Sequence, residues 1–273
     1  MSVIAISRGS LSGATRLAHG LGMRLGCRVT DREQVLAAAE RYGIGDRGLA
    51  AQDILNRHAA GFWDDHDDAR RHYLACFRAT LLDQVLEGPL VYHGNMAHAL
   101  LTGVPFVLRV RVNAPMENRV EAMMTDLGLS RYDTVKRIEA IDNERKRWAE
   151  FLYHEDIMNA SQYDVVLNLN RVSLDDGIEM VAAAARKEAF QRTPDAIRRV
   201  KDLRLATAAE IMLLSDPDAY GLPVTVSADA ARGHVEVGLS LEAGDAGLVE
   251  KQVRAALEGL GGVEVLDVRV KIG

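Results

Sequence analysis

Residues 3–22 read VIAISRGSLSGATRLAHGLG, and this stretch decides the fold class. The run from Val3 to Ser7 is short, apolar and partly β-branched, which predicts a buried strand. After the small residues at 12–14, apolar side chains recur at helical spacing, so a helix is expected there. A strand that passes through small residues directly into a helix is typical of the first unit of an α/β fold.

The link between this strand and helix has part of the composition of a phosphate-binding loop. Gly9 and Gly13 would let backbone N–H groups approach an anion, and the start of a helix favours negative charge. Thr15 stands where the hydroxyl that helps to hold Mg²⁺ belongs. Ala14 occupies the place of the usual lysine, and Arg8 occupies the place of the first glycine. On these residues alone, a simple tight turn is the alternative interpretation.

The same alternation continues along the chain. Apolar, strand-like runs at 90–94, 105–113 and 163–170 are separated by stretches of helical character. Ser173, with Asp176 three residues later, is a helix-start signal. We therefore predict an α/β fold, with a parallel sheet covered by helices on both faces. Ligands of such folds bind at the carboxyl ends of the strands, where the loop after residue 8 lies.

The pattern changes near residue 193. Thr193 can cap a helix whose first residue is Pro194, because proline lacks the N–H that this position leaves unpaired. Two strands with alternating apolar residues, a helix and a final strand are expected to follow. The sequence thus predicts two domains, residues 1–192 and residues 193–273, of which the second is a small α+β module.

Composition limits the class of partner. The 273 residues carry a formal net charge of −6, which gives no global attraction to nucleic acid or to anionic membranes. Cys27 and Cys76 do not form a disulfide framework or a metal-ligand spacing, so we expect a reducing, cytoplasmic location. No apolar run is long enough for a transmembrane segment, and the first residues do not resemble a signal peptide.

Taken together, the N-terminal motifs resemble the cytidylate kinase-like family of P-loop kinases. Members typically have an Arg-containing loop after the first strand, and an Asp-x-Glu after the next strand. Leu11 and Ala14 replace family glycines, although this branch itself lacks the standard lysine. The matching residues are Ser7 and Arg8, Ser12 and Gly13, and Asp31, Arg32 and Glu33.

Later stretches are similar to the family in order and spacing, so the resemblance covers about residues 2–190. Gly94 and Ala97 match a Gly-Arg-x-Ala segment, but Asn95 replaces the arginine that is expected to contact the acceptor nucleotide. Arg119 matches the arginine at the start of a helix after an Ala-Pro pair. Further on, the Asp-x-x-Arg of a lid-type helix, expected to reach the phosphates, is matched by Asp142 and Arg145.

The resemblance implies a kinase that moves the γ-phosphoryl group of ATP, with Mg²⁺, to a nucleoside monophosphate of the CMP or dCMP type or to a related acceptor. The residues expected to bind ATP are Arg8, Gly9, Ser10, Ser12, Gly13, Ala14 and Thr15, with Thr15 also holding Mg²⁺. The residues expected at the acceptor are Asp31, Glu33, Gly94 and Asn95. The residues expected to stabilise the transferring phosphoryl group are Arg119, Asp142, Arg145 and Arg147.

Two other functions stay open at this stage. The departures at Leu11, Ala14 and Asn95 favour a non-catalytic nucleotide sensor that regulates the C-terminal module. A structural or assembly protein without nucleotide affinity is the third. The C-terminal module resembles a BON domain through its element order and its closing "GLGGVEVLDVRV", which implies binding of a protein partner, a small ligand or a membrane surface. A homo-oligomer is also compatible with the sequence.

Several candidate residues have a structural alternative. The charges around Arg145 could form only a solvated helix face, because acidic and basic residues alternate there at pairing distance. Asp31 and Glu33 could serve only as an acidic first helical turn. His93 is interpreted as structural. The acidic residues at 64–68 are consecutive, so they do not converge on one metal ion and are better explained by a helix start.

Overall fold

The computed structural model describes residues 2–8, 12–44, 67–94, 96–153, 156–241 and 245–272. Contacts divide these into two compact units. The first contains the described residues up to Val35 and those from Glu87 to Arg192. The second contains the described residues of 36–86 and all those from Thr193 onward. Each unit is considered by itself.

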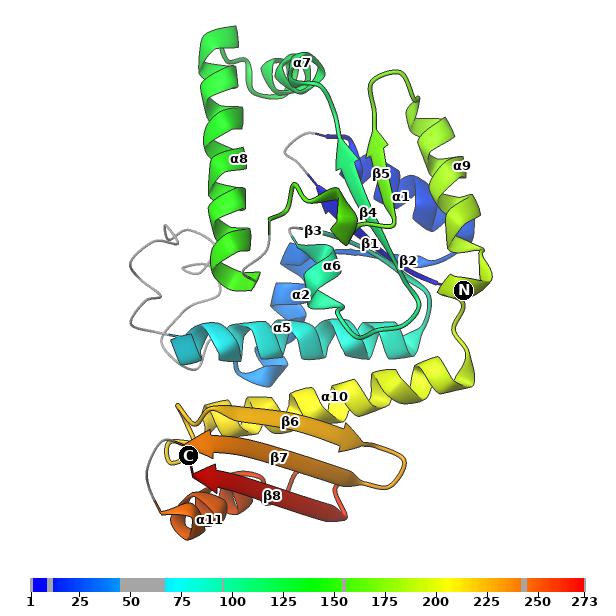
Figure 1. Cartoon of the computed structure of the whole chain (residues 1–273). Coiled ribbons are helices and arrows are strands. Elements are labelled where there is room, and N and C mark those ends of the chain that lie inside the picture. The colour runs from blue at the N-terminus through cyan, green and yellow to red at the C-terminus, as the bar shows by residue number, and fades with distance from the viewer. Residues whose placement is uncertain are drawn as a thin grey trace. The chain divides into compact units, whose positions relative to one another are not determined.

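The first unit is built on a five-stranded parallel sheet (Figure 1). The order of its strands is β2-β3-β1-β4-β5, so β1 lies in the middle. This arrangement confirms the predicted α/β class, and it places the carboxyl end of β1 at the centre of one sheet edge. The strands are β1 (Val3–Arg8), β2 (Arg28–Asp31), β3 (Leu90–Gly94), β4 (Val107–Asn113) and β5 (Val165–Asn168).

Helices lie on both faces of this sheet, as the alternation of elements predicted. On one face, α1 (Ala14–Leu25) and α9 (Leu174–Ala185) pack on each other and on the strands. On the other face lies the short helix α6 (Ala97–Leu100), whose His98 Nδ1 is 3.0 Å from Ser7 Oγ of β1. The core between α1, α9 and the strands includes Ile4, Ile6, Leu17, Leu21, Val91, Leu108, Val110, Val112, Leu167 and Val181.

A helical hairpin extends from the sheet between β4 and β5. It consists of α7 (Met116–Leu127) and α8 (Arg131–Tyr153). The two helices have a small apolar core of their own, which centres on Val120, Met123 and Ile138. Because this cluster is separate from the core under the sheet, the hairpin is held mainly by its own few side chains.

The second unit has a three-stranded sheet of order β6-β7-β8, in which β6 and β7 are antiparallel and β7 and β8 parallel. Alternate residues Val235, Val237 and Leu239 of β7 are buried against the helices, as their spacing predicted. The strands are β6 (Val224–Asp229), β7 (His234–Leu241) and β8 (Val265–Ile272), and the helices are α5 (Asp67–Glu87, all but its last residue), α10 (Pro194–Ser215) and α11 (Ala246–Ala256).

The helix-start signals of the sequence act as expected. Ser173 Oγ accepts a hydrogen bond from the backbone N–H of Asp176 (3.1 Å), and Thr193 Oγ1 accepts one from Ala196 (3.1 Å). Sequence patterns did not predict α6 or the 3₁₀ turns η1 (Glu40–Tyr42), η2 (Ala160–Gln162) and η3 (Glu188–Phe190). These segments span one turn or less, too few residues for a periodic signal. Between β2 and η1 lies α2 (Arg32–Ala39).

Candidate functional site

The start of α1 leaves backbone N–H groups available for an anion. Gly13 precedes the helix with φ +84°, and no side chain caps this end. A Cβ at Gly13 would lie 2.8 Å from Leu169 Cδ1, so both the backbone angle and the space favour glycine. The uncapped first turn of a twelve-residue helix carries the positive end of its dipole. Gly9, Ser10 and Leu11, also expected in this loop, lie outside the described residues.

Two polar side chains beside this helix start have unsatisfied atoms. Ser12 is 3% exposed, and its Oγ has no hydrogen-bond partner among the described residues. Arg8 Nη1 donates to Thr15 Oγ1 (2.9 Å), whereas the buried Arg8 Nε has no partner within the same part of the chain. Buried polar groups are normally paired, so these unpaired atoms are consistent with a ligand that is absent from the free chain. Thr15, expected at Mg²⁺, is exposed.

Arg145 of α8 is the most strongly perturbed cation near this loop. Burial lowers its pKa to about 10, and the positive charge of Arg8 lowers it further, while Asp142 acts in the opposite direction. Arg119 and Arg32 add weaker repulsion. The Nη1 atom of Arg145 is buried without a hydrogen-bond partner among the described residues. The free protein therefore holds a guanidinium in a position where an anion would be strongly favoured.

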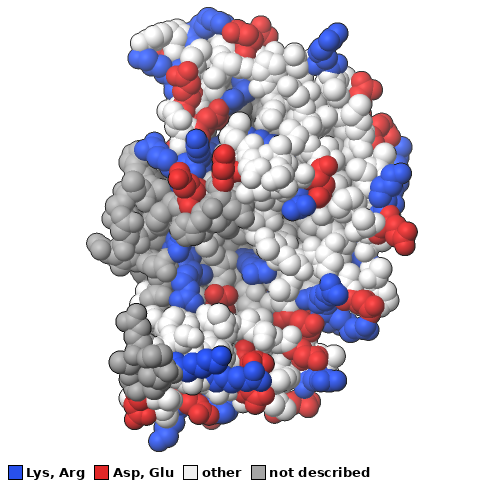
Figure 2. Space-filling view, in the orientation of Figure 1, with Lys and Arg blue, Asp and Glu red and all other residues white. Residues whose placement is uncertain are grey.

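The helical hairpin places two more of the expected residues beside Arg145. Arg119 of α7 donates to Asp142 of α8 through Nη2 and Oδ2 (2.6 Å). This pair joins the two helices and leaves Arg145 with the nearest carboxylate already bound to another arginine. The mixed acidic and basic surface of the α7–α8 region at the upper left of Figure 2 corresponds to the exposed faces of these helices.

Arg147 does not belong to this cluster. Its side chain is exposed, and its Nε lies 3.4 Å from the carbonyl oxygen of Asn143 on the same helix. Two residues along an α-helix correspond to a rotation of about 200°, so Arg145 and Arg147 point to nearly opposite sides. Helical geometry accordingly separates two residues that the resemblance had grouped.

A small cavity of about 10 Å³ lies where β1, β4 and α8 meet. Its lining contains Arg8 and Arg145 together with Arg111, a residue that the sequence interpretation did not single out. Met96, also in the lining, has φ +52°, an uncommon backbone conformation for a non-glycine residue. The strand pattern could have revealed Arg111, because Arg109 and Arg111 alternate with the buried Val110 and Val112.

The expected acceptor residues lie at the carboxyl ends of β2 and β3. Asp31 Oδ1 accepts from the backbone N–H of Gln34 (2.8 Å), and Gln34 Oε1 accepts from that of Asp31 (3.1 Å). Asp31 thus caps α2, as its structural alternative proposed, while Glu33 is exposed in the first turn. Gly94 ends β3, where a Cβ would meet the Tyr92 hydroxyl at 2.5 Å. Asn95 lies outside the described residues.

His93 occupies the same edge of the sheet and pairs in register with Asp31 and Ile6. Its side chain is buried, and its Nδ1 has no hydrogen-bond partner in the described ranges. Burial lowers the pKa of His93, and the charge of Arg8 lowers it further, while Asp31 opposes this shift. At neutral pH the imidazole is therefore uncharged.

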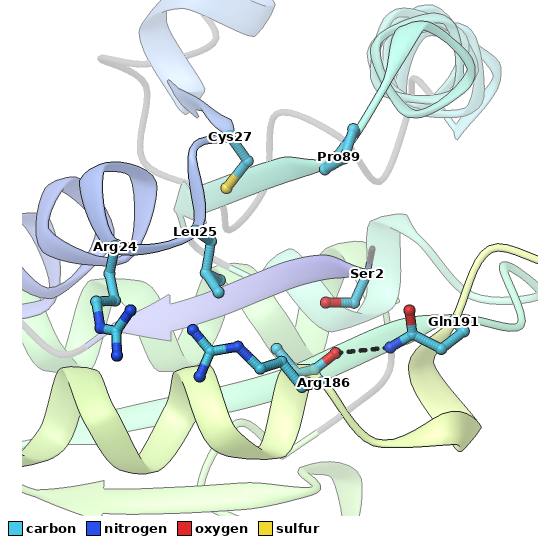
Figure 3. A pocket seen from close by; sticks show the side chains of 8 residues that line it. Ser2, Arg24, Leu25, Cys27, Pro89, Arg186 and Gln191 are labelled. Atoms are coloured by element: carbon cyan, nitrogen blue, oxygen red, sulfur yellow. Dashed lines mark hydrogen bonds between the residues drawn. The ribbon is translucent and has the colours of Figure 1, made fainter.

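Two larger pockets of this unit lie away from the loop. One, of about 210 Å³, is lined by Arg24, Cys27 and Arg186, beside the ends of α1 and α9 and the start of β1 (Figure 3). Gln191 Nε2 in its wall donates to the carbonyl oxygen of Ala185 (3.2 Å). The other, of about 500 Å³, includes Val107 and Asp164 at the starts of β4 and β5. Both adjoin the amino ends of strands, opposite the edge where α/β folds bind ligands.

No group of three His, Cys, Asp or Glu side chains that could hold a metal ion occurs among the residues that the structure describes. Of the acidic stretch at 64–68, only Asp67 and Asp68 are described, at the start of α5. Cys27 and Cys76 are free thiols. A Mg²⁺ ion at this site would accordingly depend on phosphate oxygens for most of its ligands.

Residues 3–171 match the model of the cytidylate kinase-like family, which is more than half of the chain. The chain belongs to this family. The match covers β1 to β5 and the α7–α8 hairpin, and it ends before the three-stranded sheet. No curated protein matches this cytidylate kinase-like chain.

Solved structures share the fold of this cytidylate kinase-like protein at low identity. An uncharacterized protein from Eubacterium ventriosum aligns with a TM-score of 0.53 at 15% identity, over 69% of this chain and 100% of its own. TT1252 from Thermus thermophilus has a TM-score of 0.40 at 22% identity, over 67% and 95%. A shikimate kinase from Bacteroides thetaiotaomicron has a TM-score of 0.38 at 13% identity, over 68% and 99%.

By family and fold, the chain is a kinase-like protein. None of the helices in its described ranges is both long enough and apolar enough to cross a membrane.

Proposed function

We propose that this chain binds ATP at the start of α1 and transfers its γ-phosphoryl group to a nucleoside monophosphate or a related acceptor. The observation that carries the proposal is Arg145, whose buried guanidinium has an unpaired Nη1 and a pKa lowered to about 10 by burial and by Arg8. Such a group is costly in the free protein, and a polyphosphate would relieve that cost.

The residues near the loop fit a bound phosphate chain. The N–H groups of the uncapped α1 and the Ser12 hydroxyl would bind phosphate oxygens, and Arg8 would add a charged donor. Arg145, held by α8 and accompanied by the Arg119–Asp142 pair, would stabilise the charge of the transferring group. Mg²⁺, when bound, would neutralise phosphate charge, and Thr15 is the residue placed to help hold it.

The acceptor would lie beyond β2 and β3, near Asp31, Glu33 and Gly94. His93 beside them is neutral at physiological pH, so it adds no positive charge to this part of the site. The nucleobase specificity of CMP or dCMP is proposed from the family resemblance alone. Asn95, in place of the family arginine, favours an acceptor whose phosphate is held by other cations of the site.

The test is a pair of measurements on the full chain, with thermal shift for binding and ADP release for turnover. ATP with Mg²⁺ should raise the melting temperature, by about 2.7 kcal/mol of stabilisation when its concentration is about 100 times the dissociation constant. CMP or dCMP should then stimulate ADP release. Replacing Arg145 by Gln should reduce turnover about a thousandfold. Arg137→Gln, an exposed change on the same helix, should not.

A second function is favoured by a specific contact. Arg8 donates to Thr15 Oγ1, and Ala14 stands where a lysine would reach the outer phosphates. A chain that binds ATP but releases no ADP with any acceptor would be a nucleotide sensor, and the C-terminal α+β module would then be the part that responds. Neither binding nor turnover would contradict both functions.

A further inference from the structure

Arg111 of β4 is a buried cation without an acidic partner. It is 6% exposed and pairs in register with Ser7 of β1. Arg109, two residues earlier on the same strand face, forms a bidentate ion pair with Asp164 (2.7 and 3.1 Å). Arg111 has no comparable carboxylate in the part of the chain that the structure describes. The contrast between the two arginines indicates that Arg111 is not kept for a structural ion pair.

The partners that Arg111 does have are neutral. Its Nη1 donates to the carbonyl oxygen of Ile157, and its Nη2 lies 2.8 Å from Met158 Sδ. Its guanidinium carbon is 5.7 Å from the centre of the Tyr163 ring. These contacts fix the orientation of the side chain but do not cancel its charge. Since burial of an uncompensated charge is costly, a counter-ion from outside the chain would stabilise this arrangement.

The cavity beside Arg111 is lined by cations alone among its ionisable groups. Arg8 comes from β1, Arg111 from β4 and Arg145 from α8, and the remaining lining residues are Ser7, Met96 and Ile157. Arg8 Nε and Arg145 Nη1 are the buried donors without a partner that were described above. The volume of about 10 Å³ is close to the space that one water-sized oxygen atom needs.

We propose that this cavity binds one oxygen of a tetrahedral oxyanion, with Arg111 as the third arginine of the site beside Arg8 and Arg145. The chemical class of the ligand, a phosphoryl group, rests on the proposed function. The site itself requires neither a nucleoside nor Mg²⁺. Inorganic phosphate alone is therefore a ligand, whether in the protein the phosphoryl group comes from a nucleotide or from free phosphate.

The experiment is calorimetric titration of the full chain with inorganic phosphate, at constant ionic strength maintained with chloride. The wild-type chain should bind phosphate. Arg111→Gln should weaken binding at least about tenfold, because charge-assisted hydrogen bonds are the strong ones. Arg111→Lys, which keeps the charge but loses the forked donors, should fall between the two. Arg109→Gln is the matched control, with the same change of charge on the same strand face, and should bind like wild type.

Three results would overturn the proposal. The first is a wild-type chain that shows no phosphate binding. The second is an equal loss in Arg109→Gln and Arg111→Gln, which would indicate a general charge effect. The third is unchanged affinity in Arg8→Gln. This variant at a less buried residue also keeps the test decisive if Arg111→Gln does not fold, since it should weaken phosphate binding as well.

Competition separates this inference from the proposed function. ATP or CMP that displaces phosphate identifies the nucleotide as the source of the phosphoryl group. Displacement by neither identifies free phosphate as the ligand, and then the proposed function fails while the oxyanion site stands. Conversely, full ADP release by an Arg111→Gln chain that has lost no phosphate affinity would leave the proposed function in place and overturn the site.

Discussion

Replacing Arg145 by Met should stabilise the free protein while it removes nucleotide binding. The pKa of Arg145 is lowered from 12.5 to about 10, first by burial and then by Arg8. Since each pH unit of pKa corresponds to about 1.4 kcal/mol, the charged form costs folding about 3 kcal/mol. Because the folded-state pKa lies below the unfolded one, this cost is complete below about pH 10 and is relieved as the pH rises toward 12.5.

Methionine has a similar length and no charge, so it should remove the electrostatic cost and retain much of the packing. At pH 7 we expect the free energy of unfolding without ligand to rise by about 1 to 3 kcal/mol. It is measured by urea denaturation against Arg137→Met, an exposed change on the same helix that should have little effect. The stabilisation by ATP should disappear in the Arg145 variant. A less stable free protein in Arg145→Met would refute the reasoning, because it would mean that the guanidinium is well satisfied without an anion.

Three further predictions concern the sheet edge and the loop. His93 has a folded-state pKa below its ordinary value, so its stability contribution is present above about pH 6.5 and is lost as the pH falls; melting curves between pH 5 and 7 should show a smaller acid loss for His93→Gln than for wild type. Gly13→Ala places a Cβ 2.8 Å from Leu169 Cδ1 at φ +84°, and should cost about 1 to 2 kcal/mol in urea denaturation, whereas Gly26→Ala, with open space at a similar φ, should cost less. Asp31→Ala removes the cap of α2 and should cost about 1 kcal/mol; a rise in the acceptor KM beyond this would show that Asp31 also binds the acceptor, and an unchanged stability would contradict the capping role.

The fold could be predicted because its signals are local. Each strand of the parallel sheet is an apolar run, and the caps at Ser173 and Thr193 form hydrogen bonds with residues three positions later. Gly13 has the positive φ that a strand-to-helix turn with small residues requires. Such features depend on a few neighbouring residues, so one sequence is enough to find them.

The site could be predicted only in part, since it depends on which side of each element is covered. Arg145 and Arg147 have similar sequence surroundings, but only Arg145 is turned toward Arg8. Arg111 becomes a candidate only when its neighbours at 157 and 158, distant in sequence, are known to supply no negative charge. For Asp31, the capping contact with Gln34 gives a structural role that does not depend on a ligand.

The separate core of the α7–α8 hairpin has a consequence for dynamics. Only Val120, Met123 and Ile138 are fully enclosed there, whereas β1 is covered by the main core on the α1 side. Backbone amides of α8 should therefore exchange with deuterium through local opening, well before those of β1. A phosphate group held between β1 and Arg145 would tie the hairpin to the slow-exchanging sheet. The exchange rate along α8 would then report occupancy of the site even in a chain that performs no catalysis.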